Sequence, residues 1–201
     1  MLSIIIPTRG RPTLRDTIDS LLHQLTPTDE VLVVGDGPQP QALAMVQACP
    51  SFQVQYHETP APTFCYGNAQ RNYGIAHAKG EYVAFVDDDD VYNPDALRAM
   101  RQAIEANYGR LFMFRMDVTC YGWRHIPPVL WDEREVRQGN VGGPMFVAPR
   151  NERLGNYVDL YHADFLFIRD TVARYPPGSL LWKEDIIITC RPMTTPRPNS
   201  N

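Results

Sequence analysis

The first half of the chain alternates short apolar runs with amphipathic stretches. Four runs have the length and composition of strands: residues 2–6 (LSIII), 31–34 (VLVV), 52–56 (FQVQY) and 82–86 (YVAFV). Apolar residues recur at the helical period after Pro12: Leu14, Ile18, Leu21, Leu22 and Leu25. A second such pattern follows Asn93 as N-cap and Pro94 at the first helical position: Leu97, Met100 and Ile104. This alternation predicts an α/β fold, with a mainly parallel central sheet and helices on both faces.

The second half predicts shorter strands separated by loops rich in glycine and proline. The strand candidates are residues 111–118 (LFMFRMDV), 129–131 (VLW), 145–147 (MFV) and 181–190 (LWKEDIIITC). One helix is predicted at 163–174 (ADFLFIRDTVAR). We expect a single domain over residues 1–191, followed by a disordered, proline-rich tail at 192–201.

Composition and charge narrow the class of protein. The chain has 201 residues, 44% of them hydrophobic, which suits one domain, and a net charge of -4, which provides no overall basic field for nucleic acid. The cysteines lack the spacing of a zinc site and are predicted to be reduced thiols: Cys49, Cys65, Cys120 and Cys190. The first apolar run is too short for a signal peptide and no later stretch could span a bilayer, so we expect a cytoplasmic protein without a transmembrane segment.

Four consecutive aspartates, Asp87 to Asp90, follow the apolar run at 82–86. In open parallel sheets, ligands bind outside the carboxyl ends of the strands, where these aspartates are expected. Two unit charges about 4 Å apart repel by about 4 kcal/mol at an effective dielectric constant near 20. A divalent cation bound to phosphate oxygens would compensate such charges, and Mg²⁺ or Mn²⁺ prefers oxygen ligands. The alternatives are a solvated acidic turn that caps the next helix, or a calcium site without EF-hand spacing.

The segments around the aspartates resemble a known family. NAQRNYGIAHAKGEYVAFVDDDD, LSIIIPTRGRPTLRDTIDSLLHQ and VLVVGDG are together similar to the family 2 glycosyltransferases of the GT-A fold, strongly over residues 1–105 and weakly beyond. The resemblance implies a GT-A-like domain with a nucleotide-binding half (1–110) and an acceptor half (111–191). It also implies a metal-dependent enzyme, using Mn²⁺ or Mg²⁺, that transfers a sugar from a nucleoside-diphosphate donor, UDP-linked in many relatives, to an acceptor hydroxyl with inversion. The acceptor stays open between a glycan, a small molecule and a modified nucleic acid.

The resemblance also implies roles for individual residues. Pro7, Thr8 and Arg9 would line the base and ribose, and Asp36 would accept a hydrogen bond from the base. Arg71 and Asn68 would approach the diphosphate. Asp87 and Asp89 would form the Asp-x-Asp pair, with Asp89 as the direct metal ligand. Asp88, in the nucleotide site, would occupy the variable position between them, and Asp90 would be the acid that follows the motif. Taken singly, Asp36 also suits a turn and Arg71 a helix surface.

An inverting transferase needs one carboxylate to take the proton of the acceptor hydroxyl. The family places this base in a Glu-Asp pair ahead of a helix, often with an arginine a few residues later. Asp164 fits, because it begins an apolar helical pattern and Arg169 follows, although Ala163 replaces the usual glutamate. Glu184 and Asp185 are the alternatives, on a segment that reads as a terminal strand.

Further candidates and two rival functions remain. His125, His162, Trp123, Trp131 and Trp182 could contact substrate, but such side chains more often have structural roles. The glycine-rich loop 139–147 could form a wall of the donor sugar site, approach the acceptor or merely turn the chain. One rival function is a sugar-1-phosphate nucleotidyltransferase, although PTRGRPTL lacks the lysine of that loop. The other is a sugar-nucleotide-binding protein without catalysis.

Overall fold

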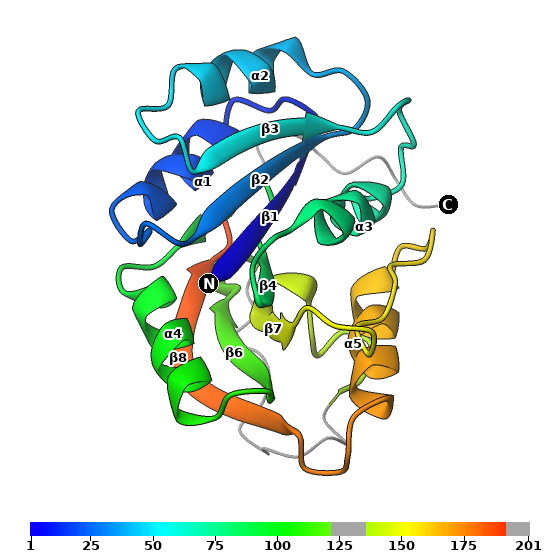
Figure 1. The fold of residues 1–201 in the computed structure, drawn as a ribbon. Helices are drawn as coiled ribbons and strands as arrows, with labels where there is room; N and C mark the ends of the chain where they lie inside the picture. The colour runs from blue at the N-terminus through cyan, green and yellow to red at the C-terminus, as the bar shows by residue number, and fades with distance from the viewer. Residues whose placement is uncertain (122–135, 192–201) are drawn as a thin grey trace.

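The apolar runs predicted from the sequence in the first half form neighbouring strands of one sheet (Figure 1). The computed structural model describes residues 1–121 and 136–191. Within them the strands are β1 (Leu2–Thr8), β2 (Glu30–Gly35), β3 (Val54–Glu58), β4 (Tyr82–Phe85), β5 (Val91–Tyr92), β6 (Leu111–Asp117), β7 (Phe146–Pro149) and β8 (Leu180–Thr189). The α-helices are α1 (Leu14–Leu22), α2 (Pro40–Gln47), α3 (Asn68–His77), α4 (Ala96–Ala106) and α5 (Ala163–Ala173).

The described strands lie in the order β3-β2-β1-β4-β7-β6-β8-β5. The pairs β1–β2, β1–β4, β2–β3 and β6–β8 are parallel, whereas β7 runs antiparallel to both β4 and β6, and β5 antiparallel to β8. Figure 1 shows α1 and α4 on one side of the sheet and α3 and α5 on the other. The predicted α/β fold with a mainly parallel, doubly covered sheet is confirmed. Because β1, β2 and β4 are parallel neighbours, the segments that follow them meet at one edge.

The central strands carry side chains that are buried on both faces. All residues of β1, β2 and β4 are buried, and one continuous hydrophobic core includes side chains from both halves of the chain. Helix α3 approaches β1 closely at Gly74, where an added Cβ would lie 2.5 Å from Ile5 Cγ2. None of the helices in the described ranges combines the length and apolarity that crossing a bilayer requires.

Most predicted elements agree with the structure to within a few residues. Strand β8 and helix α5 differ from their predicted ranges by about a residue at each end, and β3 starts at Val54 because residues 52–53 form a turn. Helices α2 and α3 were not predicted. The strand expected at 129–131 and the tail expected at 192–201 lie outside the described residues.

The predicted start of α4 is wrong. The helix begins at Ala96 after Asp95, which takes a left-handed conformation with φ 68°, and not at Pro94 after an Asn93 cap. Asn93 is instead bound to β8: its backbone N–H donates to the Ile187 carbonyl at 2.8 Å and its side-chain amide to the Ile186 carbonyl at 2.9 Å. Its side-chain oxygen, the atom that a cap would use, accepts instead from Thr189 Oγ1 at 2.7 Å.

Candidate active site

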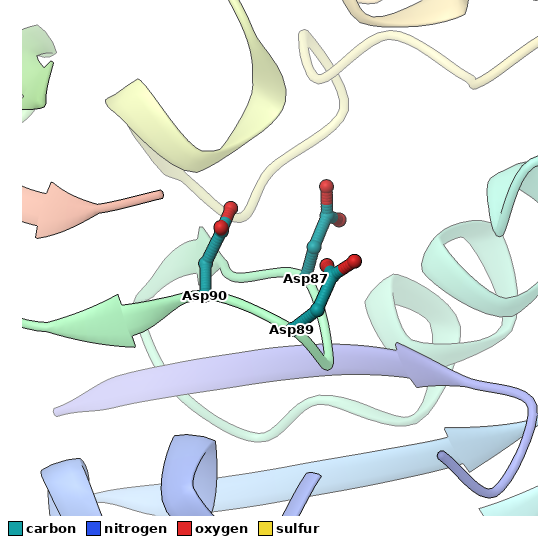
Figure 2. Close-up of side chains that lie close together, drawn as sticks. All are labelled: Asp87, Asp89 and Asp90. Atoms are coloured by element: carbon teal, nitrogen blue, oxygen red, sulfur yellow. The ribbon is translucent and has the colours of Figure 1, made fainter. Parts of the chain in front are cut away.

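The acidic turn between β4 and β5 separates its four carboxylates into two groups. Asp87, Asp89 and Asp90 each offer a carboxylate oxygen within 4.8 Å of the others, and Figure 2 shows the three side chains pointing the same way. Asp88 points elsewhere and accepts a hydrogen bond from Thr8 Oγ1 at 2.7 Å. The turn therefore brings together the two predicted metal ligands, adds Asp90 to them and binds Asp88 to the end of β1.

Among the described residues, the carboxylates of this turn outnumber the arginines that pair with them. Burial raises the pKa of Asp89 and of Asp90, and the charge of Asp87 raises both further. Burial also raises the pKa of Asp88 to about 6, although Arg11 opposes the shift. Arg11 Nη1 lies 2.5 Å from Asp89 and 3.3 Å from Asp88, and its side chain is nearly half exposed. A cluster of hard oxygen donors with excess negative charge fits Mg²⁺ or Mn²⁺.

Arg71 joins the acidic turn to the second half of the chain. Its side chain is 5% exposed and forms an ion pair with Asp87. Its Nη1 donates to the Tyr66 carbonyl at 2.9 Å, and its guanidinium lies 5.3 Å from the centre of the Tyr157 ring. Burial lowers the pKa of Arg71, but the charges of Asp87 and Asp164 outweigh burial and keep the guanidinium positive. A buried cation is thus fixed between two carboxylates that come from distant segments.

Asp164 lies in the first turn of α5, against the glycine-rich loop. Burial raises its pKa and the charge of Asp87 adds to the increase, while Arg71 and a backbone hydrogen bond from Gly143 act in the opposite direction. An added Cβ at Gly143 would lie 2.7 Å from Tyr157 Oη and 2.8 Å from Asp164 Oδ1. Only glycine allows this close approach, so the loop contacts the predicted base, which none of the three roles expected for the loop included.

The two alternative bases have different surroundings. Glu184 is exposed on β8 and forms an ion pair with Arg115 at 2.5 Å. Asp185, its neighbour on the same strand, is also exposed. The pKa of Asp164, by contrast, is shifted by the charges of both Arg71 and Asp87. Of the three candidates for the base, the geometry therefore favours Asp164, because its charge is coupled to that of the acidic turn.

Asp36 follows β2 and is surrounded by hydrogen-bond donors of the chain itself. Its Oδ1 accepts from Thr63 N at 2.6 Å, Thr63 Oγ1 at 2.9 Å and Gln70 Nε2 at 2.6 Å, and its Oδ2 accepts from Phe64 N at 3.1 Å. Burial raises the pKa of Asp36, but these hydrogen bonds outweigh burial and leave the pKa below its ordinary value. The ionised carboxylate holds the loop before α3 against the end of β2.

The end of β1 supplies the other residues expected at the nucleotide. Pro7 lies within β1, paired in parallel with β2. The Arg9 backbone N–H donates to Asp88 at 3.3 Å, as the Thr8 hydroxyl also does. The Arg9 guanidinium lies 5.3 Å from the centre of the Phe64 ring. These residues therefore share one edge of the sheet with Asp36 and the acidic turn.

Several other predicted residues have structural contacts. The buried Asn68 amide donates to the Leu160 carbonyl at 3.1 Å, which links the start of α3 to the segment before α5. His162 is the residue before α5, and Trp182 packs partly buried against the core. The remaining candidates lie outside the described residues: Trp123, His125 and Trp131.

Sequence reasoning missed three residues at this site. Asp90 was expected only as a trailing acid, although it belongs to the same run as Asp87 and Asp89. Arg11 could have been predicted from the sequence, because it lies two positions beyond Arg9 in the same motif. No sequence pattern indicated Tyr157: its hydroxyl is buried without a hydrogen-bond partner among the described residues, and its ring packs against Phe167 of α5 and Arg71 of α3.

Comparisons with known proteins identify the family of this chain. The model of glycosyl transferase family 2 matches residues 3–173. A glycosyltransferase of Haemophilus influenzae is 27% identical over 162 residues, which is 76% of this chain and 53% of that protein. The GalNAc(5)-diNAcBac-PP-undecaprenol beta-1,3-glucosyltransferase of Campylobacter jejuni is 29% identical over 113 residues, 55% of this chain and 37% of the relative. This chain thus spans about half or less of the length of these relatives.

Solved structures show the same fold. The crystal structure of S. aureus TarS 1-349 in complex with UDP-GlcNAc superimposes with a TM-score of 0.78 at 20% identity, covering 99% of this chain and 59% of that one. The complex of the same fragment with UDP also gives a TM-score of 0.78, covering 94% of this chain. The family match extends over most of the sequence, including the acidic turn, Arg71 and Asp164. The chain belongs to glycosyltransferase family 2.

Proposed function

We propose that this protein is a metal-dependent, inverting glycosyltransferase. It would transfer a sugar from a nucleoside-diphosphate donor, UDP-linked, to an acceptor hydroxyl. The observation that carries the proposal is the buried ion pair of Arg71 with Asp87, because it places a fixed cation between the acidic turn and Asp164. The family membership supports sugar transfer, and the UDP and UDP-GlcNAc complexes of TarS support a uridine nucleotide.

The donor would lie along the carboxyl edge of β1, β2 and β4. Asp87, Asp89 and Asp90 would hold Mn²⁺ or Mg²⁺, which supplies a Lewis acid for the leaving diphosphate. Arg71 adds a second, permanent positive charge directed at the same group, and it needs no rearrangement because it is already anchored. The base and ribose would lie between the end of β1 and the loop that Asp36 holds.

Asp164 would serve as the general base. Its raised pKa makes it a better proton acceptor than an ordinary exposed aspartate, and the charge of Arg71 opposes the rise and favours the ionised form. The acceptor hydroxyl gives its proton to Asp164 as its oxygen attacks the anomeric carbon from the face opposite the diphosphate. A single base on that face accounts for inversion. The acceptor class and the predicted cytoplasmic location stay predictions.

The test is a comparison of three variants in donor turnover. UDP-sugar hydrolysis or transfer is followed by UDP release in the presence of Mn²⁺, and UDP affinity is followed by calorimetry. Asp164→Asn is expected to reduce turnover about a thousandfold, with Mn²⁺-dependent UDP affinity retained. Glu184→Gln and Asp185→Asn serve as matched controls and are expected to keep full turnover.

Each rival function gives a different result. Full turnover in Asp164→Asn, or an equal loss in Glu184→Gln, would contradict the assigned base. UDP binding without turnover in the wild-type protein would indicate a binding protein. Pyrophosphate release from a nucleoside triphosphate and a sugar phosphate would indicate a nucleotidyltransferase.

A further inference from the structure

Exposed aromatic side chains gather where the loop before α3 meets the segment before α5. Phe64, Tyr66 and Tyr161 are 69%, 64% and 66% exposed, and the neighbouring Leu160 is also exposed. The rings of Tyr66 and Tyr161 meet edge to face, with centroids 5.3 Å apart and planes at 77°. We call these four residues the aromatic patch. Large apolar side chains that gather at the surface in this way often mark a binding site.

Hydrogen bonds hold the two segments of the patch together. Asn72 binds both backbone groups of Tyr157, donating to the carbonyl at 2.8 Å and accepting from the N–H at 2.9 Å. The Asn68 amide donates to the Leu160 carbonyl, and the Cys65 thiol donates to Asp159. The rings of the patch are therefore presented on a fixed base.

The backbone of the patch is strained. Phe64 and Tyr66 take left-handed conformations with φ 55° and 51°, which bulky residues rarely adopt. These conformations accompany two outward-facing rings, so core packing does not explain them. Strain of this kind persists mainly at functional positions.

The patch is continuous with the proposed catalytic site. The carbonyl of Tyr66 accepts a hydrogen bond from Arg71, the residue that pairs with Asp87. Tyr161 precedes Asp164 by three positions. An acceptor whose hydroxyl reaches Asp164 would have the rest of its body near this surface.

We infer that Tyr66 and Tyr161 form an acceptor subsite for a carbohydrate, stacking against the apolar C–H face of a sugar ring while their hydroxyls bind the ring's edge. This inference rests on the proposed function. Two amphipathic rings suit a neutral sugar, which has both an apolar face and a polar rim. A nucleic-acid acceptor would require a cluster of basic side chains for its phosphates, whereas at this patch Arg9, over the Phe64 ring, is accompanied by the acidic Asp159.

The experiment measures binding of three neutral probes to the full chain: maltotriose, cellotriose and chitotriose. Each is titrated with and without Mn²⁺ and UDP, and followed by ligand-observed NMR. At least one trisaccharide is expected to bind, and Tyr66→Ala and Tyr161→Ala are each expected to weaken it about tenfold. Tyr161→Phe, which keeps the ring, should retain most of the affinity. Tyr108→Ala, at a tyrosine that is 68% exposed, is the matched control and should change nothing.

The outcomes separate this inference from the proposed function. If no trisaccharide binds, or if Tyr66→Ala and Tyr161→Ala leave binding unchanged, the subsite is refuted. If Tyr161→Ala weakens Mn²⁺-dependent UDP binding as strongly as it weakens trisaccharide binding, the patch is part of the donor site, and the inference also fails. Binding of a single-stranded oligonucleotide through the two tyrosines would refute it as well. Failure of the wild-type protein to bind UDP would instead count against the proposed function.

Discussion

Two acidic positions lie at the carboxyl edge of the sheet, one after β2 and one after β4. Their negative charge is stabilised by the chain to different extents. Asp36 accepts four hydrogen bonds from the chain and has a lowered pKa. Within the described residues, the turn with Asp89 and Asp90 has too few donors for its charge, and both pKa values are raised. A carboxylate that the chain satisfies by itself stabilises a loop. Carboxylates that it leaves unsatisfied are suited to an external cation.

Removing one ligand of the acidic turn should have the largest effect. Asp89→Asn is expected to lower turnover about a thousandfold, because the charge that develops on the leaving group loses its stabilisation. The rise in melting temperature caused by Mn²⁺ should also disappear, since the ion binds the folded state through these carboxylates. Turnover and thermal unfolding with and without Mn²⁺ measure both effects.

The same variant without metal tests the contrast directly. Loss of one repelling charge should leave the melting temperature equal to or above that of the wild type. A clear loss of stability in metal-free Asp89→Asn would show that this turn, like Asp36, is satisfied by the chain alone.

Asp164 is intermediate between the two cases, since it has one backbone donor and one nearby arginine. Gly143→Ala places a methyl group against its carboxylate and against Tyr157, and should displace the base. We expect turnover to fall about thirtyfold, with UDP affinity unchanged, because misplacement affects the reaction more than binding. Gly142→Ala is the control, since its Cβ would lie 3.6 Å from Pro144 and 3.9 Å from Asp164. Equal losses in both variants would refute the role of this close contact.

The smallest effect is expected at Asp36, and it concerns stability. Because the pKa of Asp36 is lower in the folded than in the unfolded chain, ionisation stabilises the fold above about pH 4. Asp36→Asn should therefore lower the free energy of unfolding by about 2 kcal/mol at pH 7. The difference from wild type should shrink as the pH falls below about 4. Urea unfolding at several pH values measures it, and a difference that is independent of pH would contradict the assignment.

The parts of the molecule that follow hydrophobic periodicity were predicted well. The central strands, α5 and the position of the acidic turn at a strand end follow from local patterns. Helix α3 escaped prediction because its buried residues include Asn68, Gln70, Arg71 and Gly74, so no apolar stripe is present. Its buried side chains are polar because they bind other segments: Gln70 donates to Asp36 and Arg71 pairs with the acidic turn.

Other features depend on contacts between distant segments. Asn93 has the sequence pattern of a helix cap, but its side chain is hydrogen-bonded to β8. Tyr157 reaches the site only because α3 and the segment before α5 pack together. The separation of Asp88 from its three neighbours follows from the turn's conformation and from Thr8. Single-sequence patterns contain no signal for such contacts.

The double hydrogen bond between Asn72 and the backbone of Tyr157 anchors the segment that carries the proposed acceptor subsite. It fixes both backbone groups of one residue without using any side chain of residues 158–162. Within that short stretch the Asp159 side chain also binds the loop before α3 and would be kept, so the other side chains could be exchanged while this anchor stays intact. If Tyr161 contacts the acceptor as proposed, grafting side chains from relatives onto this stretch would change which acceptor binds.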